Sequence, residues 1–277
     1  MAVTQLTGGT RSRALTGTGG RAGFGGTLRS EFTKIRSTRS TYWTLLALVV
    51  ITIGIGALAS AAAASHPHGL DRTTFDATRQ SLGGLYVGQL VIAVLGALTI
   101  TSEYSTGMIR TSLSVMPRRG TLFAAKAVVF ALVALVTGLV ASFVSFFIGQ
   151  ALMSGHHLNA TLGQPNVLRA IIGGALFLVV CGMLAFGLGA ILRHTAGAIT
   201  AAIGLLFVVT VLVNLLPQSW QTNVNKWMPA IAGSQIWQTK TVPGAHTLAP
   251  WPGLAVFAAY AVAALIAGLI LFRRRDA

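Results

Sequence analysis

Acidic residues are scarce in this 277-residue sequence, which has five Asp and Glu against twenty Lys and Arg. Charged residues of both signs make up only 9% of the chain, whereas a soluble domain usually carries about 25%. A soluble fold of this length needs a larger polar shell than these residues supply. The composition therefore excludes an ordinary soluble domain and predicts that lipid surrounds most of the chain.

The sequence also lacks the residues of several kinds of site. Its single cysteine, Cys181, lies in an apolar run, which excludes a disulfide framework and a cysteine-based metal site. No lysine follows a glycine as in a Walker A loop, so we do not expect this chain to bind ATP in that way. Nothing acidic occurs between Glu103 and Asp276, and the predicted membrane segments hold no carboxylate for proton or sodium coupling. A pump built on this chain would take its energy from another subunit.

Long apolar runs are what the chain has in abundance. Each is close to the roughly 20 residues that cross about 30 Å of hydrocarbon as a helix. The predicted spans are residues 42–64, 82–100, 127–148, 167–192, 195–216 and 251–272. Only Arg193 and His194 separate the fourth span from the fifth, which predicts a tight helical hairpin. The fold class is therefore all-α and integral to the membrane, with six transmembrane helices.

Two polar segments precede the first span. Residues 1–27 are rich in Gly, Thr, Ser and Arg, a composition that cannot offset the entropy of ordering, so we expect a disordered basic arm. Leu28, Phe32 and Ile35 then recur at helical spacing, which predicts an amphipathic helix in the headgroup region. The charged residues assigned to this interfacial helix are Glu31, Lys34, Arg36 and Arg39.

Lys and Arg are distributed unevenly between the two sides of the predicted bundle. Twelve lie on the side that holds residues 28–41, 101–126, the 193–194 turn and the C-terminal tail, and five lie on the other side. Because cytoplasmic flanks carry the excess of positive charge, both termini are predicted to be cytoplasmic. The basic residues flank apolar runs and do not alternate with exposed aromatics, so we expect no nucleic acid partner, but membrane lipid instead.

The connection between the second and third spans is the most informative stretch. Ile109, Leu113 and Met116 repeat at helical spacing before a proline, which predicts a short helix with one apolar edge along the cytoplasmic face. Such a helix suits the groove of a partner. Burial of Glu103 would require pairing with Arg110 or with the partner, because an unpaired buried charge is expensive. An ordinary basic loop that obeys the charge rule is the alternative.

This connection resembles the cytoplasmic loop of ABC transporter permeases of the type 2 exporter class. The matching residues are Glu103, Gly107, Met108, Ile109, Arg110, Leu113, Pro117, Arg119 and Lys126. Residues 28–39 resemble the amphipathic connecting helix that opens these permeases, particularly in actinobacterial versions. The resemblance covers about residues 28–275 and makes residues 28–277 a transmembrane permease domain.

The resemblance implies the permease subunit of an ATP-driven exporter in a bacterial plasma membrane. It implies two cytoplasmic ABC ATPase subunits that hold the ATP and Mg, and a second permease copy or paralogue that completes the substrate path. The chain itself would be no enzyme and would carry no cofactor or metal. The ATPase-coupling residues implied by the resemblance are Glu103, Tyr104, Gly107, Met108, Arg110, Leu113, Arg118, Arg119 and Lys126.

Two other functions compete with this one. A scaffold or sensor that does not transport would also place basic loops on the cytoplasmic side. An intramembrane enzyme would use His66 or His68 with Asp71 or Asp76 as acid and base, but no nucleophile–base pair lies close to membrane level. A metal site needs three or four convergent ligands, and of the histidines only this pair has acids nearby, so we disfavour a metal site there.

Some features indicate packing more than chemistry. The spacings Gly84 to Gly88 and Ser145 to Gly149 let helices approach closely. Polar side chains in or near apolar segments are expected to bond across helices in preference to lining a path; these are Gln89, Gln150 and Asn214. The long segment 217–250 is either a re-entrant or surface helix that caps the outer exit, or an interfacial belt of aromatic residues.

Overall fold

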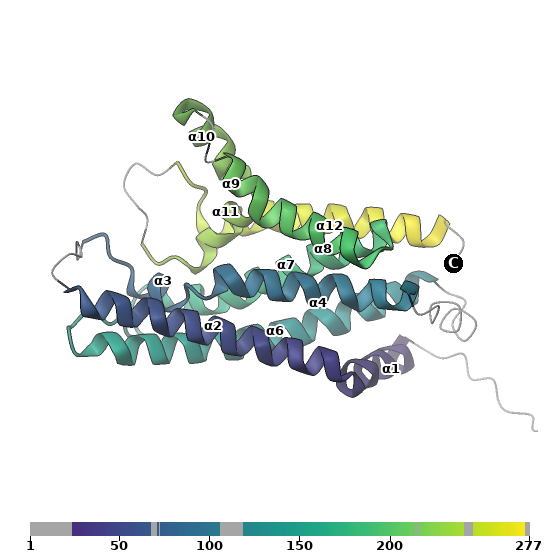
Figure 1. The fold of residues 1–277 in the computed structure, drawn as a ribbon, viewed down its shortest axis with the longest axis horizontal. Helices are drawn as coiled ribbons and strands as arrows, with labels where there is room; N and C mark the ends of the chain where they lie inside the picture. Colours follow the sequence, from purple (N-terminus) through teal and green to yellow (C-terminus); the bar gives the residue numbers. More distant parts are fainter. Residues whose placement is uncertain are drawn as a thin grey trace, which may run out of the picture.

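The computed structural model describes residues 24–67, 71, 73–105, 119–213, 215, 217–240 and 246–274, which form a bundle of helices without strands (Figure 1). Its first half consists of α1 (Phe24–Ser37), α2 (Arg39–Ser65), α3 (Ala77–Ser81), α4 (Leu85–Ser105) and α6 (Arg119–Ser154). Its second half consists of α7 (Val167–Leu192), α8 (Thr195–Ile203), the π-helix η2 (Gly204–Val208), α9 (Val209–Val213), α10 (Gln218–Val224), η3 (Asn225–Trp227), α11 (Pro229–Ser234), η4 (Gln235–Trp237) and α12 (Pro250–Arg274).

Six of these helical stretches are long and apolar enough to cross a membrane, which confirms the predicted all-α membrane fold. They are α2, α4, α6, α7, the α8–η2–α9 stretch and α12. The largest difference from the predicted spans is α6, whose 36 residues extend beyond 127–148 at both ends. Lys126 and Gln150 are buried against other parts of the chain, so these polar residues have partners inside the protein and do not end the helix.

Helix α7 forms the centre of the bundle. It is apolar on all sides, and Phe177, Leu178 and Cys181 are completely buried, as expected for a helix with neighbours all around it. It packs against α4, α6 and α12. The predicted close approach at Gly84 and Gly88 is confirmed between α4 and α2, because a Cβ on Gly88 would lie only 2.6 Å from Oγ1 of Thr52.

The predicted hairpin between the fourth and fifth spans is confirmed. Arg193 ends α7 in the left-handed conformation, with a φ of 54°, and reverses the chain within one residue. His194 then caps α8, because its Nδ1 accepts a hydrogen bond of 3.2 Å from the backbone N–H of Gly197. Two residues therefore suffice to connect two membrane-spanning helices.

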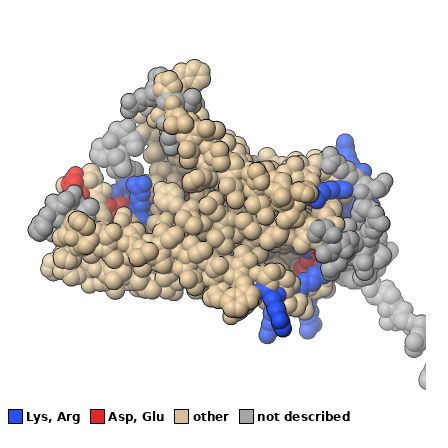
Figure 2. All heavy atoms as spheres, viewed as in Figure 1, with Lys and Arg blue, Asp and Glu red and all other residues tan. Residues whose placement is uncertain are grey.

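One end of the bundle gathers α1, the end of α4, the start of α6, the α7–α8 turn and the end of α12 (Figure 1). We call it the basic end, because Lys and Arg side chains cluster there (Figure 2). The opposite end carries α3 and the connection between α6 and α7. The basic segments that the sequence assigned to the cytoplasmic side thus lie together, as far as the structure describes them. This agrees with the uneven count of Lys and Arg.

The helices around the segment between the fifth and sixth spans divide into an outlying part and a packed part. Helices α9 and α10 turn away from the rest of the bundle (Figure 1), and Trp220 and Trp227 are exposed. The following α11 and η4 instead pack against α12 and α7. Trp237 is completely buried there, 4.8 Å from the ring of Tyr86 in an edge-on contact. Part of the segment therefore belongs to the core, and part presents aromatic rings to the surroundings.

Candidate functional site

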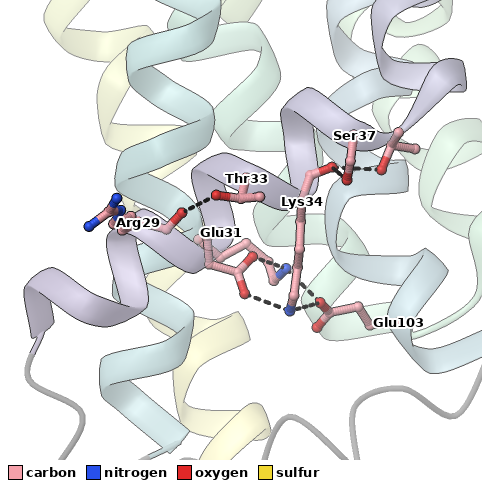
Figure 3. A network of polar contacts seen from close by, with 8 residues as sticks. Arg29, Glu31, Thr33, Lys34, Ser37 and Glu103 are labelled. Carbon is pink, nitrogen blue, oxygen red and sulfur yellow. Dashed lines mark hydrogen bonds and ion pairs between the residues drawn. The ribbon is translucent and has the colours of Figure 1, made fainter.

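Four charged side chains of alternating sign meet at the basic end (Figure 3). The Nζ of Lys126 lies 2.6 Å from Oε2 of Glu31 and 2.8 Å from Oε1 of Glu103. The Nζ of Lys34 lies 2.8 Å from Oε1 of Glu31 and 3.3 Å from Oε1 of Glu103. Each carboxylate therefore contacts two ammonium groups, and each ammonium group contacts two carboxylates. We call these four residues the charge cluster.

Three members of the charge cluster are almost entirely removed from solvent. The side chains of Glu31, Lys126 and Glu103 are 2%, 5% and 8% exposed, whereas that of Lys34 is 37% exposed. A charge at such a depth is tolerated only when it is paired and hydrogen-bonded. Two negative and two positive groups give the cluster no formal net charge, which satisfies this requirement.

Three separate segments supply the charge cluster. Glu31 and Lys34 lie one turn apart on α1, Glu103 lies in the last turn of α4, and Lys126 lies in the early part of α6. Residues 106–118, between α4 and α6, are outside the described residues. The cluster therefore ties α1 to both helices that flank this connection.

The charges of α1 stabilise one another. Burial raises the pKa of Glu31, but the ammonium of Lys126 and the hydrogen bonds from Lys126 and Lys34 outweigh it and hold this pKa below its ordinary value. Burial likewise lowers the pKa of Lys34, but the hydrogen bond to Glu31 and the negative charges of Glu103 and Glu31 raise it above its ordinary value. Both residues are therefore charged at neutral pH.

The side of α1 that packs against the protein is more polar than the helical spacing of its apolar residues predicted. Glu31 and Thr27 are buried, Leu28 and Ile35 are half-buried, and Phe32 is 52% exposed. Glu31 shares the helical face of Leu28 and Ile35, so the sequence did contain a signal that this carboxylate would be buried. The remaining charged residues of the predicted interfacial helix, Arg36 and Arg39, are exposed, and Arg39 opens α2.

Only some of the predicted ATPase-coupling residues can be placed. Glu103, Tyr104, Arg119 and Lys126 are described, whereas Gly107, Met108, Arg110, Leu113 and Arg118 lie outside the described residues. The partner expected for Glu103, Arg110, is among the latter, and Glu103 pairs with Lys126 and Lys34. Two sets of residues that the sequence analysis treated separately, those of the interfacial helix and those of the connection, thus form one site.

Tyr104 joins the last turn of α4 to the other helices of the basic end. The guanidinium carbon of Arg193 lies 5.0 Å from the centre of its ring, and the ring of Phe272 lies edge-on at 6.4 Å. Arg193 in turn donates a hydrogen bond of 3.2 Å to the backbone oxygen of Leu271. The residue next to Glu103 therefore contacts the α7–α8 turn and α12, and a movement of this end of α4 would reach both.

Asp76 organises the opposite end. Its side chain caps α3 by accepting from the backbone N–H of Arg79, and it also accepts from the backbone N–H of Thr239 at 2.6 Å and of Lys240 at 3.0 Å. Arg169 of α7 donates to the backbone oxygen of Gln238 at 2.8 Å. The sequence analysis offered Asp76 as an acid, base or metal ligand, but its lone pairs are engaged in fixing the chain after η4.

The histidine and acid groups of this end do not converge on one point. The Nδ1 of His66 lies 2.9 Å from Oγ of Ser65, and the side chain of Asp71 accepts from Thr73 and Thr74. His68 lies outside the described residues. In the part of the chain that the structure describes, no three His, Cys, Asp or Glu side chains come together to hold a metal ion.

The polar side chains of the spans have mostly structural partners. Gln150 donates to the backbone oxygen of Ala77 at 3.2 Å and accepts from the backbone N–H of Ala160 at 2.6 Å, which confirms that it bonds between segments. Gln89 donates only within its own helix, to the oxygen of Tyr86. The third residue of this group, Asn214, lies outside the described residues.

Comparison with known families agrees with this architecture. The family model of the ABC-2 family transporter proteins matches residues 27–211, which is two thirds of the 277-residue chain. The match begins inside α1 and ends inside α9, so it contains the whole charge cluster. No curated protein matches the chain significantly. The chain belongs to the ABC-2 family of transporter proteins and is a multi-pass permease component of an ABC transporter.

Proposed function

We propose that this permease is driven by a separate ABC ATPase that binds at the basic end, and that it exports its substrate from the cytoplasm. The charge cluster carries the proposal, because it connects α1 to both helices that flank residues 106–118. A force applied to that connection reaches three elements at once. Such rigid-body displacement of packed helices is a common way to couple a binding event to a distant opening.

In this proposal the basic end faces the cytoplasm of a bacterium, and both termini lie there. The excess of Lys and Arg supports this orientation. The energy comes from ATP and Mg held by two ATPase subunits, and a second permease copy or paralogue completes the substrate path. The predicted coupling helix, around residues 105–113, binds a groove of the ATPase through Leu113 and its neighbours, with Arg110 at its polar side.

Site-directed cross-linking tests the contact. Replacing the only cysteine (Cys181→Ala) leaves a background in which Leu113→Cys introduces one reactive thiol in the connection. We expect this thiol to cross-link to a co-purified ATPase. A matched control, Leu162→Cys, introduces an exposed thiol between α6 and α7 at the opposite end, and we expect no cross-link from it.

The same two variants test the orientation. A maleimide that does not cross membranes should label the Leu113→Cys variant only in inside-out vesicles, and the Leu162→Cys variant only in cells or right-side-out vesicles. Labelling of position 113 from outside, or gentle purification without an ATPase partner, would contradict the proposal. ATP-dependent flux in proteoliposomes then separates a transporter from a scaffold that merely binds the ATPase.

A further inference from the structure

A crevice opens beside the charge cluster, between the first and second spans. Helices α2 and α4 touch where Thr52 faces Gly84 and Gly88, and they diverge toward the basic end. The crevice begins roughly two turns before that contact, at Thr44 of α2 and Leu95 of α4, and its volume is about 380 Å³. This volume lies in the range of small-molecule pockets, roughly 300–1,000 Å³.

The crevice lies at the depth where lipid headgroups are expected. Its wall on α2 includes Thr41 and Thr44, which flank the exposed rings of Tyr42 and Trp43. Exposed Tyr and Trp at the end of a span mark the interface between hydrocarbon and water. A molecule that enters the crevice from the bilayer therefore brings its polar group, and not its acyl chains, to this place.

The lining is rich in hydrogen-bonding groups. Seven of its 14 residues carry a hydroxyl group, and only three are apolar. The hydroxyls of Thr44 and Thr99 already donate to carbonyl groups of their own helices, at 2.9 and 2.7 Å, so what they offer a ligand is the lone pairs of their oxygen atoms. These walls therefore suit a ligand that donates hydrogen bonds, such as a primary ammonium group.

The floor of the crevice is the charge cluster, and it sets the charge of the ligand. All four cluster residues line the crevice, and their charges cancel. A ligand with a net charge would add an uncompensated charge beside three almost fully buried charged groups, which is costly. Lys34 is the most exposed member, so its ammonium group, although it bonds Glu31 and Glu103, is the one that a phosphate oxygen can reach. A dipolar ligand satisfies the walls and the floor together.

We propose that this crevice binds the phosphoethanolamine headgroup of a zwitterionic phospholipid from the leaflet at the basic end. The ammonium group donates to the hydroxyl groups of α2 and α4, and the phosphate lies toward Lys34. Leu95 and Leu98, the apolar residues on the α4 side, contact the first carbons of the lipid. The bound lipid bridges α1, α2 and α4, whether or not an ATPase is present.

Native mass spectrometry of the intact purified chain tests the proposal. Phosphatidylethanolamine, phosphatidylcholine and phosphatidylglycerol with identical acyl chains are titrated separately into delipidated protein in detergent. We expect the ethanolamine lipid to bind about tenfold more tightly than the choline lipid, which has no N–H donors, and than the anionic glycerol lipid. Equal binding of the three lipids would overturn the proposal, because it would indicate unspecific annular lipid. Binding of soluble phosphoethanolamine without binding of the lipid would also overturn it.

Isosteric variants locate the site. The double substitution Thr41→Val and Thr99→Val removes two hydroxyl groups from the crevice without changing its shape, and we expect it to abolish the preference for the ethanolamine lipid. The matched control is Thr210→Val in α9, where the hydroxyl makes the same bond to its own helix at 3.2 Å but lines no part of the crevice. A preference that survives the double substitution, or that is lost in the control, would refute the assignment. Near-ultraviolet circular dichroism verifies that each variant is folded.

Discussion

Replacing Lys126 by methionine is the sharpest test of the charge cluster. Methionine has nearly the same length and apolar volume as the stem of lysine, so the substitution Lys126→Met removes the charge and little else. It takes away the contacts of 2.6 Å to Glu31 and 2.8 Å to Glu103. Lys34 then remains as a counter-charge for the two buried carboxylates, and its contact to Glu103 is the longest of the four at 3.3 Å.

The size of the effect follows from this geometry. Breaking a buried ion pair by removing one partner costs about 3–5 kcal/mol, because the other charge stays buried without compensation. The double variant Lys126→Met with Glu31→Gln restores neutrality, since Lys34 and Glu103 remain as one pair. We therefore expect the single substitution to cost about 3 kcal/mol and the double variant about 1 kcal/mol, which is a coupling energy of about 2 kcal/mol or more.

The measurement is the unfolding equilibrium of the purified chain in mixed micelles, followed by tryptophan fluorescence over a denaturing-detergent titration. The substitution Arg29→Met serves as a control, because Arg29 is an exposed cation on the same helix and points away from the cluster (Figure 3). We expect it to change the stability by less than about 0.5 kcal/mol. If the double variant lost as much stability as the two single variants added together, the argument that these charges act as one neutral unit would be refuted.

Three further predictions follow from the same structure. The pKa of Glu31 is lower in the folded chain than its ordinary value of 4.5, so its contribution to stability is complete above pH 4.5 and is lost as the pH falls through the folded value. Hydrogen exchange should therefore show α1 loosening in acid before the other helices. An acid response spread evenly over the bundle would contradict this. The substitution Asp76→Asn weakens the acceptor that caps α3 and fixes the backbone after η4, and it should cost about 2 kcal/mol. Hydrogen exchange should become faster at the amides of Arg79, Thr239 and Lys240, and unchanged exchange there would show that other contacts hold these segments. Gly84→Ala places a methyl group against the backbone of α2 and should cost about 1–3 kcal/mol in thermal unfolding. The control Gly54→Ala places its methyl group in open space and should be neutral or stabilising. Equal effects of the two substitutions would argue against the close packing of α2 on α4.

The architecture was accessible from the sequence because the bilayer imposes simple requirements. Apolar runs of sufficient length must be helices, and the two-residue turn at Arg193 and His194 leaves a hairpin as the only connection between two of them. The ends of the helices were less accessible. Lys126 and Gln150 look like residues of the membrane surface, but both are buried against partners, and sequence patterns do not show which polar residues have partners.

Only part of the charge cluster could be predicted from the sequence, for the same reason. The resemblance to the family selected Glu103 and Lys126 together with Glu31 and Lys34, but it assigned them to two separate functions. Their pairing joins positions up to 95 residues apart, and a single sequence without an alignment carries no signal for such a contact. The sequence did hold one clue, since Glu31 lies on the apolar face of its helix.

Asp76 shows a different limit. An acid near histidines suggests chemistry, and the sequence analysis kept that option open. Its actual partners are backbone N–H groups more than 160 residues away, and backbone groups look alike at every position of a sequence. Only the fold shows that this carboxylate fixes a loop.

Helix α6 runs for 36 residues without a break, which is about 54 Å of continuous helix against about 30 Å of hydrocarbon. Lys126 lies near one end of this helix, and Gln150, which holds α3 and the start of the α6–α7 connection, lies near the other. A continuous helix of this length links the two ends of the bundle directly, so in the proposed coupling to an ATPase a shift at the basic end would move the opposite end with it.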